Sequence, residues 1–271
     1  MTIPAPWATA IHEYLAAQRD AGRPETTIAA RRQHLEHLAR RVHTDPWRLT
    51  GPELRDYTRA QPWMPETRRG RRTTFLSFWR WAVAEGHTLE NPATILPPVA
   101  ASSPNPRPAP DDVYRLALAR ATDLERIMLR LAADCGLRRA EVARVHSRDL
   151  MQDLIGWSLT VHGKGGRVRV VPLTDRLARD LLALGPGYAF PGADNGHLSP
   201  RWIGRRISRL LGPDWTMHKL RHRAATRVYQ ASAGDTFIVQ ELLGHASPAT
   251  TRRYVRVPST AIRAAVLAAA D

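Results

Sequence analysis

One segment of this chain has neither helical nor strand periodicity, and it divides the chain into two parts. Residues Leu96 to Pro110, LPPVAASSPNPRPAP, are rich in proline, serine and alanine. Proline lacks a backbone N–H and holds φ at about −65°, so such a segment does not continue a helix or enter the middle of a sheet. The sequence therefore predicts two domains, residues 1–95 and 111–271, joined by a linker over residues 96–110.

The first part has the pattern of four helices. Apolar residues recur at helical spacing over about residues 7–21, 26–42 and 65–85. Between the second and the last of these ranges, Thr50 followed by Glu53 fits a capping box, which opens a short third helix.

The second part is expected to be mainly helical with a small sheet. Residues Trp157 to Val161 and Arg167 to Val171 alternate or are β-branched, and the residues between them are rich in glycine. This pattern predicts a β-hairpin with Lys164 at its tip. Helices are expected over residues 122–135, 139–145, 174–183, 200–211, 218–230, 236–243, 247–254 and 259–270. The predicted fold class is mainly α with this small β-hairpin.

The charge of the chain indicates an anionic partner. Lysine and arginine number 40 against 25 acidic residues, which gives a formal net charge of +15. The excess is larger after residue 106, where 26 basic and 15 acidic residues stand. A bias toward arginine also arises in GC-rich genomes, but codon bias alone need not unbalance acids and bases. Nucleic acid is therefore the expected partner.

Several other classes of protein are excluded by the sequence. No apolar run approaches the ~20 residues of a membrane span, and the first 20 residues do not have the pattern of a signal peptide. The single cysteine, Cys135, rules out a disulfide framework and cysteine-based zinc modules. The Walker A spacing is also missing, so nucleotide binding is unsupported. We expect a cytoplasmic protein with no membrane partner and no cofactor.

Six side chains in the second part form a set suited to chemistry on a phosphodiester. Arginine forks match the oxygens of a phosphate and bind more strongly as those oxygens gain charge. A histidine can act as a base or a hydrogen-bond donor, and a lysine can protonate an alkoxide. A tyrosine, with a pKa of about 10, can serve both as nucleophile and as leaving group. The six are Arg138, Lys164, His218, Arg221, His245 and Tyr254.

Taken singly, these residues have ordinary structural explanations. Arg138 and Glu141 are three apart and would share a helix face as a solvated ion pair. Lys164 between glycines is typical of an exposed turn. His218 and His222 are four apart and could face a metal ion, but no carboxylate in that helical turn completes a site, so we expect none. The combination is therefore more specific than any of its members.

The order and spacing of these residues resemble the tyrosine recombinase (phage integrase) family. The similarity lies in GLRRAEV at 136–142, GKGG at 163–166, HKLRH at 218–222, VQELLGH at 239–245 and TTRRY at 250–254. It implies that Arg138 and Arg221 clamp the scissile phosphate and that Lys164 is the general acid toward the 5′-hydroxyl. Tyr254 would be the nucleophile and would form a 3′-phosphotyrosyl intermediate.

The same resemblance implies roles for the remaining polar residues. His218 would be the general base or a phosphate donor, and His245 a further donor to the phosphate. Glu141 would have a supporting structural role, and His222 would orient its neighbours. The second part would be an α+β catalytic domain.

The first part is similar to the four-helix, SAM-like core-binding domain of that family. Its candidate contacts to the DNA backbone are arginines, with a solvated arginine face as the alternative. These candidates are Arg31, Arg32, Arg68, Arg69, Arg71 and Arg72. Little sequence precedes Trp7, so we expect a simple recombinase without an arm-binding domain.

The resemblance implies a site-specific recombinase acting on double-stranded DNA, such as a phage or mobile-element integrase. An Xer-type resolvase or a transposon recombinase would use the same chemistry. From a different class, a DNA-binding relative without catalysis remains an alternative. A homotetramer is expected in the synaptic complex, aided by accessory proteins that bend DNA or set direction. The apolar helix expected over 259–270 would contact a partner copy or fold onto its own domain.

Overall fold

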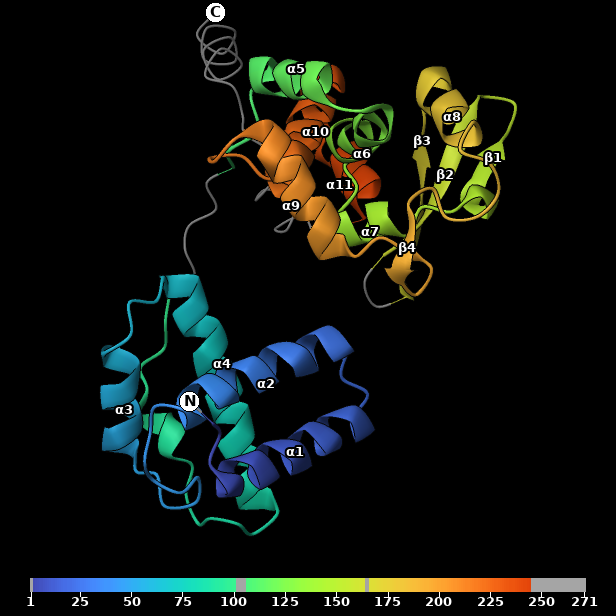
Figure 1. Cartoon of the computed structure of the whole chain (residues 1–271). Coiled ribbons are helices and arrows are strands. Elements are labelled where there is room, and N and C mark those ends of the chain that lie inside the picture. Colours follow the sequence, from blue (N-terminus) through green and yellow to red (C-terminus); the bar gives the residue numbers. More distant parts are fainter. Residues whose placement is uncertain (1, 101–105, 164–165, 245–271) are drawn as a thin grey trace, which may run out of the picture. The chain divides into compact units, whose positions relative to one another are not determined.

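The computed structural model describes residues 2–100, 106–163 and 166–244, and the chain forms two compact units (Figure 1). These units are Met1–Ser103 and Pro104–Asp271, so the division falls inside the proline-rich segment. Each end of that segment packs into the core of one unit. Leu96 is buried in the core of the first unit, and Ala109 is buried in the core of the second. Among the described residues, no helix has the length and apolarity needed to cross a membrane.

The first unit is a four-helix domain, as its periodicity predicts. Its elements are α1 (Ala5–Asp20), α2 (Glu25–Ala39), α3 (Gly51–Arg59), α4 (Pro65–Ala84) and the 3-10 helix η1 (Pro92–Ile95). The predicted capping box opens α3, because the Thr50 hydroxyl accepts from the Glu53 N–H and the Glu53 carboxylate accepts from the Thr50 N–H at 2.8 Å. Such a cap satisfies N–H groups that the helix itself leaves unpaired.

Aromatic rings fill the core of the first unit. Phe78 lies edge-on to Tyr14 and Trp79, with ring centroids 5.3 and 5.1 Å apart. The indole N–H groups of Trp7 and Trp79 donate to backbone carbonyls at 2.9 and 3.1 Å. Burial of these large rings stabilises the domain without leaving a polar atom unpaired on either tryptophan.

The second unit contains seven α-helices and one 3-10 helix, η2 (Ser147–Asp149), among its described residues, together with a small sheet. The α-helices are α5 (Asp111–Arg120), α6 (Asp123–Ala133), α7 (Arg139–Ala143), α8 (Asp175–Leu182), α9 (Pro200–Leu211), α10 (Met217–Ala231) and α11 (Thr236–Leu243). In Figure 1, α10 lies among α6, α9 and α11, and it packs against all three. Helix α6 also opens with a capping box, formed by Thr122 and Glu125.

The sheet consists of three antiparallel strands in the order β1 (Leu150–Gln152), β2 (Trp157–His162) and β3 (Val168–Pro172). The predicted hairpin is therefore present, with Leu159 opposite Val171 and Val161 opposite Arg169. Its tip, residues 164–165, lies outside the described residues. The predicted fold class, mainly α with a small sheet, is confirmed.

Five elements were not predicted: the helix α5, the strands β1 and β4 (Pro191–Asp194), and the short 3-10 helices η1 and η2. Helix α5 follows Pro110 directly and begins with Asp111 and Asp112, a combination that favours a helix start. This helix start was not recognised in the sequence because it directly follows the proline-rich segment. Strands β1 and β4 have three and four residues, too few for alternation to be recognised. The helices expected over 247–254 and 259–270 lie outside the described residues.

Candidate active site

Glu141 is the centre of a buried network that joins α7 to the hairpin. Its side chain is 2% exposed. The carboxylate accepts from the backbone N–H of Arg138 at 2.9 Å and from Nη1 of the same residue at 2.7 Å. Arg169, on β3, donates from Nη1 to Oε1 at 3.1 Å and from Nη2 to Oε2 at 2.8 Å. The carboxylate of the ion pair expected at a solvated helix face is therefore buried, while the Arg138 side chain stays partly exposed.

The charge state of Glu141 follows from these contacts. Burial alone would raise the pKa of the carboxyl, but the hydrogen bonds and charge of Arg169, and then the backbone and side-chain hydrogen bonds from Arg138, lower that pKa to about 2. The carboxylate is therefore ionised at neutral pH. It provides a fixed negative charge that orients the arginines around it.

Arg221, on α10, connects two helix ends beneath the same site. Its side chain is 1% exposed. It donates from Nη1 to the carbonyl oxygen of Gly136, which follows α6, and from Nη2 to that of Leu243 at 2.7 Å. Gly136 has a φ of +66°, and a Cβ there would come within 2.7 Å of a Leu243 methyl carbon. Glycine thus permits both this turn and the close approach of the Leu243 side chain, at the end of α11.

His218 and His222 face each other one turn apart on α10. Their Nε2 atoms are 3.1 Å apart, and their ring centroids are 4.6 Å apart. Burial, followed by the charge of His218, lowers the pKa of His222 to about 4. Desolvation, followed by the charges of Arg221 and Arg138, also lowers the pKa of His218. Both rings are therefore neutral at pH 7, and one Nε2 can donate to the other.

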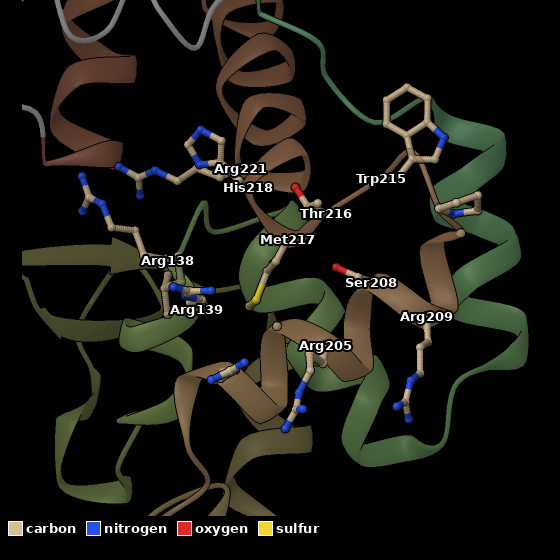
Figure 2. Close-up of a pocket in the computed structure, with 15 residues that line it drawn as sticks. Arg138, Arg139, Arg205, Ser208, Arg209, Trp215, Thr216, Met217, His218 and Arg221 are labelled. Atoms are coloured by element: carbon tan, nitrogen blue, oxygen red, sulfur yellow. The ribbon is translucent and has the colours of Figure 1, made fainter. Parts of the chain in front are cut away.

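Arg138, His218 and Arg221 border a pocket of about 1190 Å³ in the second unit. Figure 2 shows Arg138, His218 and Arg221 gathered on one side and Arg205 and Arg209 along α9. The pocket is lined by side chains of α7, α9 and α10 and by the chain between α9 and α10. Its lining is strongly cationic, which suits a polyanionic ligand.

A stripe of arginines on α9 was missed by the sequence analysis. Arg201, Arg205 and Arg209 are four residues apart, are exposed, and line the pocket. Spacing of four places side chains on one helix face, so the predicted helix over 200–211 carried the signal. Arg206 does not share this spacing, and it forms an ion pair with Glu125 of α6.

Three of the six expected catalytic residues cannot be placed, because Lys164, His245 and Tyr254 lie outside the described residues. The structure brings together the other three, Arg138, His218 and Arg221, around one pocket.

Cys135 and the described histidine and acidic residues have structural surroundings. Burial, followed by the charge of Asp134, raises the pKa of the Cys135 thiol to about 12, so this cysteine is a protonated core residue. Among residues 2–100, 106–163 and 166–244, no group of three or more histidine, cysteine, aspartate or glutamate residues could hold a metal ion.

The arginines of the first unit that were expected to contact DNA have different environments. Arg32 is exposed and Arg69 pairs with Glu66 at 2.9 Å. Three others donate hydrogen bonds within the first unit. Arg31 donates to the Tyr14 hydroxyl. Arg68 donates to the Gln61 carbonyl, and Arg72 to the Leu96 carbonyl.

Arg71 departs from the expected surface position. It is 8% exposed, and its guanidinium lies 4.2 Å from the ring centroid of Trp63. Stacking on an aromatic ring stabilises a buried guanidinium, which makes Arg71 a packing residue of the first unit.

Known proteins are similar to this chain in sequence and in fold. Residues 111–260 match the model of the phage integrase family. Tyrosine recombinase XerC of Rhodospirillum centenum is 38% identical over 205 residues, which cover 67% of this chain and 59% of that protein. XerC of Chromobacterium violaceum is 30% identical over 269 residues, covering 90% of this chain and 89% of that protein.

A solved structure shows the same fold. It is that of a lambda integrase (75-356) dimer bound to a COC′ core site, with a TM-score of 0.71 and 20% identity, and it covers 89% of this chain and 95% of that chain. From the family match and these relatives, the chain belongs to the phage integrase family of tyrosine recombinases.

Proposed function

We propose that this chain is a site-specific recombinase that cuts and rejoins duplex DNA through a 3′-phosphotyrosyl intermediate. The observation that carries the proposal is the arrangement of Arg138 and Arg221 about the ionised Glu141, beside His218 at the cationic pocket. One carboxylate cannot neutralise two clamp arginines and Arg169 together. The excess positive charge suits a phosphodiester, whose oxygens gain charge as the phosphorus becomes five-coordinate.

His218 has the charge state that a base or donor at this site requires. Its lowered pKa keeps the imidazole neutral at pH 7, and the side chain is exposed toward the pocket. A neutral ring can take a proton from an attacking hydroxyl. His222, 3.1 Å away, orients the ring through the contact between the two Nε2 atoms.

In the proposed reaction, the Tyr254 oxygen attacks the scissile phosphorus while the bond from phosphorus to the 5′-oxygen breaks. His218 takes the proton of the tyrosine, and Lys164 gives a proton to the departing 5′-oxygen. His245 donates a further hydrogen bond to the phosphate. The 5′-hydroxyl of a partner strand reverses these steps and releases Tyr254. The phosphoester bond is conserved throughout, so no external energy source is needed.

We assign the second unit to catalysis and the first to binding of the core site, each contributing arginine contacts to phosphates. Counterion release from such contacts would supply much of the affinity. A solved relative with a TM-score of 0.70 and 21% identity is a lambda integrase tetramer bound to a Holliday junction. By analogy, we propose that four copies of this chain assemble on two DNA duplexes, with accessory proteins that bend the DNA, in the bacterial cytoplasm.

Two biological roles fit this chemistry. We favour integration and excision of a phage or mobile element. The XerC relatives support resolution of chromosome or plasmid dimers as the second candidate. The location of the target site distinguishes these roles: a site at the boundary of an integrated element supports the first, and a single site elsewhere on the chromosome or on a plasmid supports the second.

The test is to capture covalent protein–DNA adducts. The full chain is incubated with sheared, lightly nicked DNA of the genome that encodes it, denatured with detergent, and the protein-bound fragments are sequenced. Nicks beside a cleavage site release a short strand, which traps the intermediate. We expect enrichment of one or a few loci with the wild-type chain and none with Tyr254→Phe. Equal recovery with both proteins would contradict the proposal, and sequence-specific binding without an adduct would identify a non-catalytic relative.

A further inference from the structure

Arg169, on β3, has a set of contacts that the proposed reaction does not use. Its two terminal nitrogens donate to the two oxygens of Glu141 at 3.1 and 2.8 Å, and its Nε donates to the carbonyl oxygen of Leu242 at 2.8 Å. The side chain is 9% exposed. Because every nitrogen of the guanidinium faces a protein acceptor, Arg169 is not placed to bind a phosphate itself.

The contact with Leu242 holds the end of α11. The last carbonyls of a helix lack partners within the helix and carry partial negative charge. Here the Leu242 carbonyl accepts from Arg169 and the Leu243 carbonyl accepts from Arg221. Two cations from different elements therefore bind adjacent carbonyls at the point where the chain leaves α11.

Gly244 makes this close approach feasible. It ends α11 with a φ of +62°, in the left-handed region. A Cβ at this position would lie 2.9 Å from Cδ of Arg169, closer than van der Waals contact. The glycine thus serves both the turn of the chain and the packing of the arginine side chain.

The position of Arg169 in the sheet does not depend on its side chain. Its strand is paired to β2 by a backbone ladder, with Arg169 opposite Val161. Substitution of the side chain therefore leaves the hairpin paired and removes the link to Glu141 and α11. Lysine cannot replace this link, because a single ammonium does not reproduce the planar fork that binds both carboxylate oxygens and a carbonyl together.

We propose that Arg169 is a positioning residue that fixes the end of α11 against the Arg138–Glu141 pair, and that attack by Tyr254, which follows α11 in the sequence, depends on this anchor. The inference rests on the proposed function. Arg169 acts on the nucleophile through the Leu242 carbonyl, and it does not touch the reacting atoms. Its loss is expected to slow attack by Tyr254 and to leave protonation of the leaving group by Lys164 intact.

The first test needs no DNA. Amide hydrogen exchange is measured on the full chain for wild type, R169K, R169Q and the control R179Q, whose arginine is exposed and donates to a carbonyl of its own helix. In both Arg169 variants we expect faster exchange over residues 236–244 and unchanged exchange over α6. In R179Q we expect the exchange of the wild type throughout the chain. R169K keeps the positive charge, so it still tests the proposal if R169Q lowers the fraction of folded protein. Unchanged exchange over 236–244 in R169K would overturn the proposal.

The second test separates attack from leaving-group protonation. Single-turnover cleavage is measured on a nicked duplex of the captured sequence, with oxygen or with sulfur at the 5′ bridging position. A thiolate departs without a general acid, so Lys164→Ala is expected to recover on the sulfur substrate. R169K and R169Q are expected to cleave about 10- to 100-fold more slowly on both substrates, with wild-type DNA affinity.

The outcomes distinguish this inference from the proposed function. Wild-type cleavage by R169K, or recovery of its cleavage on the sulfur substrate, would overturn the role of Arg169. If cleavage falls only in proportion to the fraction of folded protein and to the DNA affinity, Arg169 has a purely structural role. That result would also overturn the positioning role. Failure of the wild-type chain to form any adduct would instead contradict the proposed function, while the exchange experiment would still test the anchoring of α11.

Discussion

The guanidinium of Arg221 donates to the carbonyl oxygen of Leu243 at 2.7 Å, so a buried residue of α10 is bonded to the last turn of α11. The same side chain binds the carbonyl of Gly136 and lies 3.9 Å from Glu141. Arg221 therefore joins three parts of the second unit and also borders the pocket. Its contribution to stability and its proposed contribution to catalysis can be measured separately by comparison with Arg138, whose side chain is 37% exposed.

Arg221→Lys is expected to reduce both cleavage and stability. The lysine cannot satisfy two carbonyls at once, and the loss of a buried hydrogen bond to each lowers the free energy of unfolding by about 2–4 kcal/mol. Loss of a donor to the transition state lowers the cleavage rate by about 10²- to 10³-fold. Arg138→Lys should lose cleavage to a similar degree with a smaller loss of stability. Urea unfolding and single-turnover cleavage measure the two effects, and wild-type cleavage by Arg221→Lys would refute the clamp.

The parts of this fold that were predictable from sequence depend on local patterns. The hairpin follows from alternation on both sides of a glycine-rich turn, and the starts of α3 and α6 follow from capping boxes. The pairing of Arg138 with Glu141 follows from their spacing on one helix turn. Each signal lies within a few residues and needs no knowledge of the tertiary structure.

The features that were missed depend on contacts between distant parts of the chain. Arg169 is 28 residues from Glu141 and 73 from Leu242, and no periodicity links these positions. The burial of Arg71 against Trp63 is likewise set by the packing of the first unit. The α9 stripe was visible as a spacing, but only the fold shows that it borders the same pocket as His218.

Acid is expected to destabilise the second unit through His222. The folded-state pKa of about 4 is below the unfolded value of about 6.5, so the unfolded chain binds the proton first as the pH falls. The stabilisation is fully present above about pH 6.5 and is lost toward pH 4. The expected loss is about 2 kcal/mol between pH 7 and pH 5.

Urea unfolding of wild type and His222→Gln at both pH values checks this expectation. The variant lacks the titrating ring and should lose less stability on acidification. His34 and His37 in the first unit have similarly lowered pKa values of about 4, but they are present in both proteins and cancel in the difference. An equal loss in the two proteins would contradict the assignment to His222.

The α9 stripe is expected to contact DNA phosphates. Arg205→Ala should weaken binding of the captured site and reduce the slope of log affinity against log salt by about 1, because one fewer counterion is released. Arg179→Ala removes an exposed arginine that does not line the pocket and serves as the control. Fluorescence anisotropy over a series of salt concentrations measures both slopes. Identical slopes for Arg205→Ala and wild type would exclude this contact.

Metal chelation is expected to leave cleavage unchanged, because arginines supply the positive charge that the phosphate requires. Single-turnover cleavage with and without EDTA tests this point. A complete loss of cleavage on chelation, restored by a divalent cation, would show that His218 and His222 bind a metal ion.

The most direct test of the account is to identify the residue that carries DNA in the trapped adduct. The adduct formed by the wild-type chain is digested with nuclease and protease, and the peptide with an attached nucleotide is sequenced by mass spectrometry. The account predicts a nucleotide joined through its 3′-phosphate to the oxygen of Tyr254. Attachment to any other residue, or through a 5′-phosphate, would contradict it.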